Sequence, residues 1–297
     1  MGQEETEMKK HAEAITGSTG LLCLLGAPVK HSISPEMHNE AFRLLDLDYR
    51  YLAFETKQED LKKAVDGLRT FGALGWNLTM PLKTAMVPLC DELTLNAELC
   101  GAVNTVVNRD GKLVGTTTDG LGWVLSARAE GHEIRGKHLT LLGAGGAGSS
   151  VLAECAVEGA AVIDVFKRKN ETWDAVAAFV RNTAEKTDCS VRIHDMADLD
   201  DLKACIMESD ILLNGTPVGM PGNPGCLIPD ESFFHPGLVV SDMIYEPRET
   251  ELLKMARRAG LQTFNGMYML LYQGAAAFSF WTGQEMPVEA VRKKYFS

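Results

Sequence analysis

The feature that most constrains the fold is a glycine-rich turn, Gly143-Ala144-Gly145-Gly146-Ala147-Gly148. It follows an apolar run at 139–142 and precedes a stretch of helical composition, which is the context that a dinucleotide-binding turn needs. The first glycine permits a tight turn, the second lets the backbone approach a pyrophosphate, and the third allows close helix–strand packing. Amide groups and the helix dipole would hold the phosphates. The alternative interpretation is a glycine-rich connector without a ligand.

Alternating strands and helices surround this turn. We expect a buried strand at 138–142, further strands at 161–166, 191–194, 210–214 and 238–244, and helices at 149–158 and 172–186. Gly159 and Gly260 fall where helix C-caps are expected. This rhythm predicts a doubly wound parallel sheet of the Rossmann type.

The first part of the chain alternates in the same way. We expect strands at 21–27, 49–54 and 73–79, and helices at 34–45, with Pro35 at its first position, and at 58–69. Asp110-Gly111 between two short apolar runs predicts a tight hairpin, so this sheet should be mixed.

A chain of 297 residues is long enough for two domains. We predict an N-terminal mixed α/β substrate domain over 1–119, with 1–19 as a frayed extension or short helix, and a Rossmann domain over 120–266. The boundary is expected near residues 118–122, and the C-terminal helices, 267–297, are expected to cross back onto the first domain. The active site is then expected in the cleft between the two domains.

Composition excludes several function classes. A net charge of −11 argues against nucleic acid or an anionic membrane as the main partner. No apolar run approaches the ~20 residues of a membrane span, and the N-terminus lacks the apolar core of a secretory signal. The seven cysteines are scattered without a CxxC pair, and His31 and His38 are not spaced as a ligand set. We therefore expect reduced thiols, a cytoplasmic location and no metal.

The end of the second Rossmann strand bears on the choice of cofactor. Asp164 is 21 residues past Gly143, but it falls inside the expected strand rather than at its tip, where a carboxylate would bind the ribose 2′-hydroxyl of NAD. The tip is Lys167-Arg168-Lys169-Asn170. Its three cations favour a 2′-phosphate, Arg168 could instead stack on adenine, and a solvated basic turn is the third interpretation. The choice between NAD and NADP stays open.

Polar patches also follow the expected strands of the first domain. Ser32 and Ser34 place two hydroxyls at a helix start, which suits a carboxylate, whereas Ser34 alone could be a plain N-cap. Thr79 and Lys83 follow the strand at 73–79. Asn104 lies in a third patch.

A fourth patch is Thr118-Asp119-Gly120. Taken alone, Asp119 is best explained as the cap of a helix that begins near Leu121.

Taken together, the patches resemble one family. HSISP, NLTMPLK, GAVNT, TDGLG, GAGGAG, NGTPVGM, DMIYEP and YQGA…FWTG occur in the order seen in shikimate dehydrogenases, over Leu21 to Gly283. The NLTMP, KTDC and LLYQGAAAFSFWTG stretches are most similar to the quinate/shikimate dehydrogenase branch, which accepts both substrates with NAD or NADP.

The resemblance implies roles for individual residues. It implies a catalytic pair, Lys83 and Asp119, and a substrate carboxylate held around Ser32, Ser34 and Tyr245. Ring hydroxyls would bond to Thr79, Asn104 and Gln273. The implied cofactor positions are Gly143, Ala144, Gly145, Gly146, Ala147, Gly148, Lys167, Arg168, Lys169, Asn170, Thr216, Met243 and Gly266.

Two positions depart from the family pattern. Thr117-Thr118 precedes Asp119 where an asparagine is usual before Thr-Asp-Gly. Asn170 stands where the dual-cofactor branch often has an aspartate, which weakens an expectation of NAD preference.

The implied activity is reversible hydride transfer between NAD(P) and the ring C3 alcohol or ketone of shikimate or quinate. Whether Lys83 acts as a general base or as an electrostatic relay stays open. The alternatives are a non-catalytic sensor of shikimate or quinate and a dehydrogenase of another small polyol acid. The oligomeric state is also open, with a homodimer as one alternative.

Overall fold

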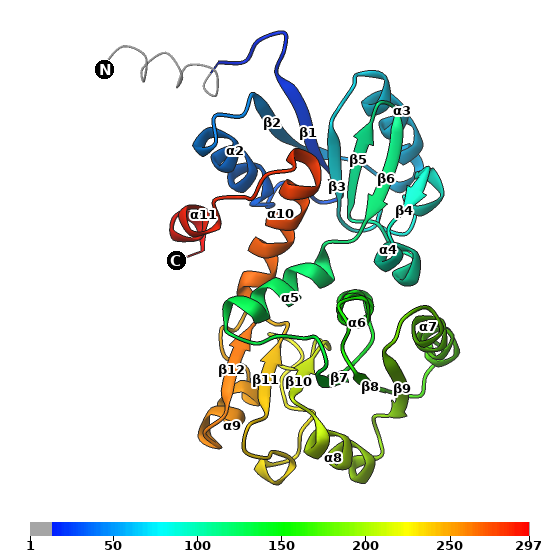
Figure 1. Ribbon diagram of the computed structural model, residues 1–297, viewed down its shortest axis with the longest axis vertical. Coiled ribbons are helices and arrows are strands. Elements are labelled where there is room, and N and C mark those ends of the chain that lie inside the picture. Colours follow the sequence, from blue (N-terminus) through cyan, green and yellow to red (C-terminus); the bar gives the residue numbers. More distant parts are fainter. Residues whose placement is uncertain (1–13, 297) are drawn as a thin grey trace. The chain divides into compact units, whose positions relative to one another are not determined.

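The computed structural model describes residues 14–296, and the chain divides into two compact units (Figure 1). Unit 1 comprises the residues up to Thr118 together with those from Gln273 onward, and unit 2 comprises Asp119–Tyr272. Most of the extension predicted at 1–19 lies outside the described residues.

Unit 1 is built on a six-stranded mixed sheet of order β2-β1-β3-β5-β6-β4. Its strands are β1 (Gly20–Gly26), β2 (Tyr49–Glu55), β3 (Gly75–Leu78), β4 (Glu92–Leu93), β5 (Thr105–Arg109) and β6 (Lys112–Thr116). β1 is parallel to β2 and β3, whereas β5 is antiparallel to both β3 and β6. Asp110 and Gly111 both have positive φ, 53° and 87°, so the predicted tight hairpin and mixed sheet are confirmed.

The helices of unit 1 are α2 (Ser34–Leu44), α3 (Leu61–Thr70), α4 (Leu95–Cys100) and α11 (Val288–Tyr295), with 3₁₀ turns η1 (Gln58–Asp60) and η2 (Val87–Leu89). The helix predicted at 58–69 was wrong in its first turn, because η1 occupies Gln58–Asp60. Leu61, Val65 and Leu68 follow at helical spacing and pack into the core with Trp76.

Unit 2 holds six parallel strands in the order β12-β11-β10-β7-β8-β9. They are β7 (His138–Leu142), β8 (Val162–Lys167), β9 (Ser190–Asp195), β10 (Ile211–Asn214), β11 (Val239–Asp242) and β12 (Gln262–Asn265). Counting β7 as the first, this is the Rossmann order, and the predicted doubly wound sheet is confirmed. The strand order reverses between β7 and β10, the point where such sheets bind ligands.

Helices cover both faces of this sheet. They are α5 (Asp119–Ala129), α6 (Gly146–Val157), α7 (Trp173–Lys186), α8 (Leu199–Glu208) and α9 (Glu251–Arg258), with a 3₁₀ turn η3 (Glu231–Phe233). Neighbouring residues of β7 point to opposite cores: Leu141 packs with Trp123 of α5, and Leu142 packs with Leu202 of α8. Because a hydrophobic core lies on each face of the sheet, these strands carry apolar residues on both faces.

Three predicted boundaries in unit 2 were wrong. Helix α6 begins at Gly146 rather than near Ser149, and α5 begins at Asp119 rather than near Leu121. The strand expected at 238–244 ends at Asp242, whose carboxylate accepts the amide of Ile244 at 3.0 Å and so ends the extended run.

Helix α10 (Met267–Thr282) begins in unit 2 and ends in unit 1. Near its end, the indole of Trp281 donates a 2.8 Å hydrogen bond to the carbonyl oxygen of Val106 in β5. Across residues 14–296, no helix combines the length and apolar character that crossing a membrane requires.

Candidate functional site

The polar patches of unit 1 meet at one edge of its sheet. Ser32 follows the carboxyl end of β1, and Thr79 follows that of β3, its parallel neighbour. The strand β5 is antiparallel to β3, so its amino end, preceded by Asn104, lies at the same edge. The strand β6 reverses direction again and delivers Thr118 there. Topology therefore gathers residues that are far apart in sequence.

Ser32 and Ser34 form a hydroxyl pair at the start of α2. The Ser32 hydroxyl donates to the Ser34 hydroxyl at 3.1 Å and accepts the amide of Ser34 at 3.2 Å. The N-cap residue is Ile33, with no side-chain capping bond, so the reading of Ser34 as a plain N-cap is wrong. The pair is half-buried at a helix N-terminus, where an anion is favoured.

The backbone around Thr79 and Lys83 is tightly fixed. The Thr79 amide donates to the carbonyl of Leu25 at 2.9 Å, and the Lys83 carbonyl accepts the amide of Val103 at 2.9 Å. A Cβ atom on Gly26 would lie 2.2 Å from the Thr79 methyl, so only glycine fits beside this threonine. The half-buried Lys83 side chain thus projects from a rigid turn.

A buried hydrogen-bond chain lies beneath this edge. The Tyr51 hydroxyl donates to the Asn77 amide oxygen at 2.7 Å, and the Asn77 amide nitrogen donates to the Thr105 hydroxyl at 2.9 Å. The Thr105 hydroxyl donates to the Asn104 amide oxygen at 2.8 Å, which also accepts the backbone amide of Thr118 at 2.8 Å. The chain fixes the orientation of the Asn104 amide, one of the implied substrate ligands.

Three other predicted substrate-side residues belong to different elements. Gln273 is a half-buried residue of α10, and its neighbour Gly274 packs so closely on α2 that a Cβ there would lie 2.1 Å from the Met37 methyl. Asp119 is the first residue of α5 and Tyr245 follows β11 with 56% exposure, both in unit 2.

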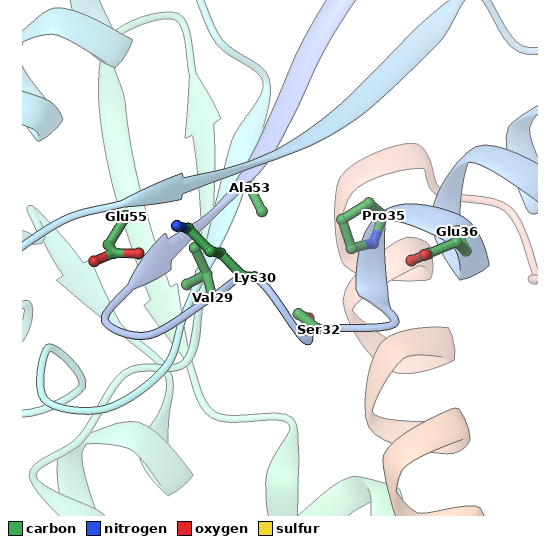
Figure 2. A pocket seen from close by; sticks show the side chains of 7 residues that line it. All are labelled: Val29, Lys30, Ser32, Pro35, Glu36, Ala53 and Glu55. Carbon is green, nitrogen blue, oxygen red and sulfur yellow. The ribbon is translucent and has the colours of Figure 1, made fainter.

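A pocket of about 290 Å³ lies beside Ser32, and its lining residues are Val29, Lys30, Ser32, Pro35, Glu36, Ala53 and Glu55 (Figure 2). In this view the Lys30 ammonium group points toward Glu55 and away from Ser32. Two carboxylates against one ammonium make this pocket a poor site for an anionic substrate. The carboxylate site therefore rests on the serine hydroxyls and the start of α2.

The glycine turn of unit 2 has the geometry predicted from its sequence. Gly143 has φ of +88°, and a Cβ on Gly148 would lie 2.4 Å from the Gly143 carbonyl oxygen, so α6 packs directly on the strand end. A Cβ on Gly145 or Gly146 would meet nothing within 4 Å. These exposed glycines leave open backbone at the start of a helix, which fits a pyrophosphate.

The loops beside this turn line the point where the strand order reverses. A Cβ on Gly143 would lie 2.4 Å from the Thr216 methyl, which places the loop after β10 against the turn. Both the amide and the hydroxyl of Thr216 donate to Asn214, at 3.0 and 2.7 Å. A Cβ on Gly266 would lie 2.0 Å from the Met243 carbonyl, so these two predicted cofactor residues are adjacent.

Two of the three cations at the basic tip of β8, residues 167–170, already have polar partners. Lys167 donates to the Asn170 side chain at 2.8 Å, and the Lys169 ammonium group lies 3.2 Å from the Asp195 carboxylate. Among residues 14–296, Arg168 makes no hydrogen bond or ion pair and is exposed.

Asp164 lies inside β8, as predicted, and is fully buried. Together with His194 and Cys205 it places three potential metal ligands within 4.8 Å of one another. However, Arg192 donates two hydrogen bonds to Asp164, at 2.6 and 2.7 Å, and His138 and His194 bond to it at 2.7 and 2.8 Å.

Burial raises the pKa of Asp164, but the hydrogen bonds from His194, Arg192 and His138 outweigh burial and hold that pKa below its usual range. The carboxylate is therefore charged, and its four acceptor sites are occupied. Because a guanidinium also lies beside it, we interpret the cluster as an ion-pair network that ties β7, β8 and β9 together.

Comparison with known proteins agrees with this geometry. The family model for the shikimate dehydrogenase substrate binding domain matches residues 24–106. The family model for the shikimate 5′-dehydrogenase C-terminal domain matches residues 266–294. A curated relative from Listeria monocytogenes, named shikimate dehydrogenase (NADP(+)), is 44% identical over 97% of this chain and 99% of its own length.

Two solved structures are also similar. The shikimate 5-dehydrogenase of Listeria monocytogenes, in complex with shikimate and NAD, has a TM-score of 0.91 and 44% identity, over 94% of this chain and 97% of that one. The quinate dehydrogenase of Corynebacterium glutamicum, in complex with NAD, has a TM-score of 0.81 and 30% identity, over 94% and 99%.

Proposed function

The chain belongs to the shikimate dehydrogenase family, and from this premise we propose that it interconverts shikimate and 3-dehydroshikimate with NADP as the main cofactor. One observation carries the proposal. Hydroxyl, amide and lysine side chains meet at one edge of the unit 1 sheet, while unit 2 presents an open glycine turn at the start of a helix. The first suits a polyhydroxy acid and the second suits a dinucleotide.

The substrate would be held by polar groups on separate elements. Ser32 and Ser34 receive the carboxylate at the start of α2, where the Ser32 hydroxyl turns from Ser34 to the carboxylate so that both hydroxyls donate to it. Thr79, Asn104 and Gln273 bond to the ring hydroxyls, and the carboxylate receives a further contact from Tyr245 when substrate is bound. Quinate carries the same carboxylate and a similar ring, so we propose it as a second substrate.

A bound nicotinamide would supply the hydride acceptor for the C3 carbon of the ring. The chain's own residues must then remove the hydroxyl proton and stabilise the oxygen as it changes between alcohol and ketone. We assign this to Lys83, whose ammonium group donates a proton to the oxygen during ketone reduction and whose amine accepts it during alcohol oxidation. Asp119 orients Lys83 and accepts a hydrogen bond from an adjacent hydroxyl. A fixed turn at Lys83 favours this role, because proton transfer depends on position.

On the cofactor side, backbone amides from Ala144 to Ala147 would hold the pyrophosphate. Thr216, Met243 and Gly266 would line the rest of the cofactor site. Arg168 meets the 2′-phosphate of NADP or stacks on the adenine. The seven cysteines are all free, which agrees with the cytoplasmic location that we propose.

Transfer of deuterium from shikimate to the cofactor distinguishes a dehydrogenase from a non-catalytic sensor of shikimate. The protein is incubated with shikimate deuterated at C3 and NADP⁺, and the reduced cofactor is isolated for mass spectrometry. An enzyme moves the deuterium to the nicotinamide, whereas a sensor binds shikimate and leaves both compounds unchanged. Absence of labelled NADPH, with shikimate binding confirmed by calorimetry, would favour the sensor.

A further inference from the structure

The last pair of residues in the β8–β9 ladder sets an acid beside the basic tip. Lys167 is the register partner of Asp195, and the amide of Met196 donates to the Lys167 carbonyl at 3.0 Å. Asp195 is therefore held at the carboxyl end of β9, next to the loop that reads the ribose 2′ position in Rossmann domains.

The Asp195 carboxylate is fixed in position by the backbone. One of its oxygens accepts the amide of Ala197 at 3.0 Å, and the other lies 3.2 Å from the Lys169 ammonium group. The Ala197 hydrogen bond, and after it Lys169, lower the pKa of Asp195, so the carboxylate is charged at neutral pH.

Lys169 is thereby engaged from two sides. Its ammonium group contacts the Asp195 carboxylate and also lies over the Trp173 ring, 5.6 Å from the centroid. Lys167 is bonded to Asn170. Of the three cations at the tip, Arg168 alone lacks such a partner within the part of the chain that the structure describes.

We propose that Asp195 is a specificity-determining residue that restrains Lys169 and so moderates the preference for a 2′-phosphorylated dinucleotide. A 2′-phosphate must compete with Asp195 for the Lys169 ammonium group, whereas a ribose 2′-hydroxyl has no such need. Asp195 acts through Lys169 and is therefore a positioning residue. The inference rests on the proposed function, because it assumes that the β8 tip receives the adenosine ribose.

The test compares Asp195→Asn, which keeps an acceptor for the Ala197 amide, with the unmodified protein. Initial rates with shikimate give kcat and KM for NADP⁺ and NAD⁺. We expect KM for NADP⁺ to fall so that the NADP⁺/NAD⁺ ratio of kcat/KM rises about two- to fivefold, the range that an exposed ion pair supports. This gain should shrink in 1 M salt, where the Debye length is about 3 Å.

Two controls separate this effect from a general change of charge. Asp200→Asn removes the same charge from an exposed position in α8, and should leave the ratio unchanged. In a Lys169→Gln background, Asp195→Asn should have no effect on the ratio. An unchanged or lower ratio in Asp195→Asn, or an equal rise without Lys169, would overturn the inference.

A binding measurement distinguishes failure of this inference from failure of the proposed function. Calorimetry compares 2′,5′-ADP with ADP on the same proteins and requires no turnover. If Asp195→Asn strengthens only 2′,5′-ADP while shikimate is not oxidised, the inference stands and the proposed reaction fails. If shikimate is oxidised but Asp195→Asn changes the affinities for 2′,5′-ADP and for ADP equally, the proposed reaction stands and the inference fails.

Discussion

The Tyr51 hydroxyl donates a 2.7 Å hydrogen bond to the Asn77 amide oxygen, and both residues are buried. Asn77 in turn donates to Thr105, and Thr105 donates to the Asn104 amide oxygen. A tyrosine on β2 therefore helps to orient a proposed substrate-binding residue beside β5, three strands away. Burial raises the pKa of Tyr51, and the phenol stays neutral and able to donate at any working pH.

Tyr51→Phe should therefore weaken both the fold and the site. Removing the donor leaves a buried amide oxygen short of a partner, which costs about 1–3 kcal/mol of unfolding free energy. KM for shikimate should rise, because the Asn104 amide loses its fixed orientation. Urea unfolding and steady-state kinetics measure the two effects. Tyr49→Phe is the matched control on the same strand, and equal effects from both changes would contradict the role of the chain.

Lys83→Ala should lower kcat for shikimate oxidation by roughly 10²- to 10⁴-fold, the contribution typical of a positioned proton-transfer group. KM should change much less, since the carboxylate and hydroxyl contacts remain. Lys62→Ala, on the exposed face of α3, is the control and should leave kcat intact. Near-normal turnover by Lys83→Ala would remove this lysine from the mechanism.

Two glycine substitutions should separate cofactor binding from folding. Gly145→Ala meets no protein atom within 4 Å, so the melting temperature should hold while KM for the dinucleotide rises. Gly148→Ala places a Cβ 2.4 Å from a backbone oxygen and should cost roughly 1–3 kcal/mol of stability. Thermal melts and cofactor titrations of both variants provide the check. An unchanged cofactor KM in Gly145→Ala would mean that the open turn holds no phosphate.

His38 should make the fold sensitive to acid. Both ring nitrogens are buried without a hydrogen-bond partner among the described residues, and burial lowers the pKa of His38 to about 3. The unfolded chain takes up this proton below about pH 6.5, while the folded chain resists it until about pH 3. The free energy of unfolding should thus fall as pH decreases through that window, by at most about 5 kcal/mol.

His38→Phe tests this acid sensitivity. The ring centroids of His38 and Tyr51 lie 4.5 Å apart, and a phenylalanine ring fills the same stacked position but cannot titrate. The free energy of unfolding, measured by urea denaturation from pH 7 to pH 4, should fall less steeply in the variant. Parallel pH profiles for the two proteins would contradict the assignment.

Much of the cofactor half could be predicted because its signals are local. The glycine turn, the apolar strand before it and the basic tip are contiguous, and the structure places each where the motif predicts. The start of α6 was misjudged because glycine has a low helix propensity, which the packing of Gly148 on Gly143 overrides.

The rest of the site depends on contacts between distant residues. Tyr51 looks like a core aromatic in sequence, and its partner Asn77 lies 26 residues later. The only local signal is an asparagine inside the buried strand Gly75–Leu78, where a polar side chain requires a partner. The pairing of Lys169 with Asp195 was equally hidden, because it depends on the register between β8 and β9.

The most direct test of the account is absorbance at 340 nm in four mixtures, shikimate or quinate with NAD⁺ or NADP⁺. We predict reduction of the cofactor in the shikimate mixtures, fastest with NADP⁺, and slower reduction with quinate. No increase in absorbance in any of the four mixtures, from protein shown to be folded, would contradict the assignment of this chain as a dehydrogenase of shikimate.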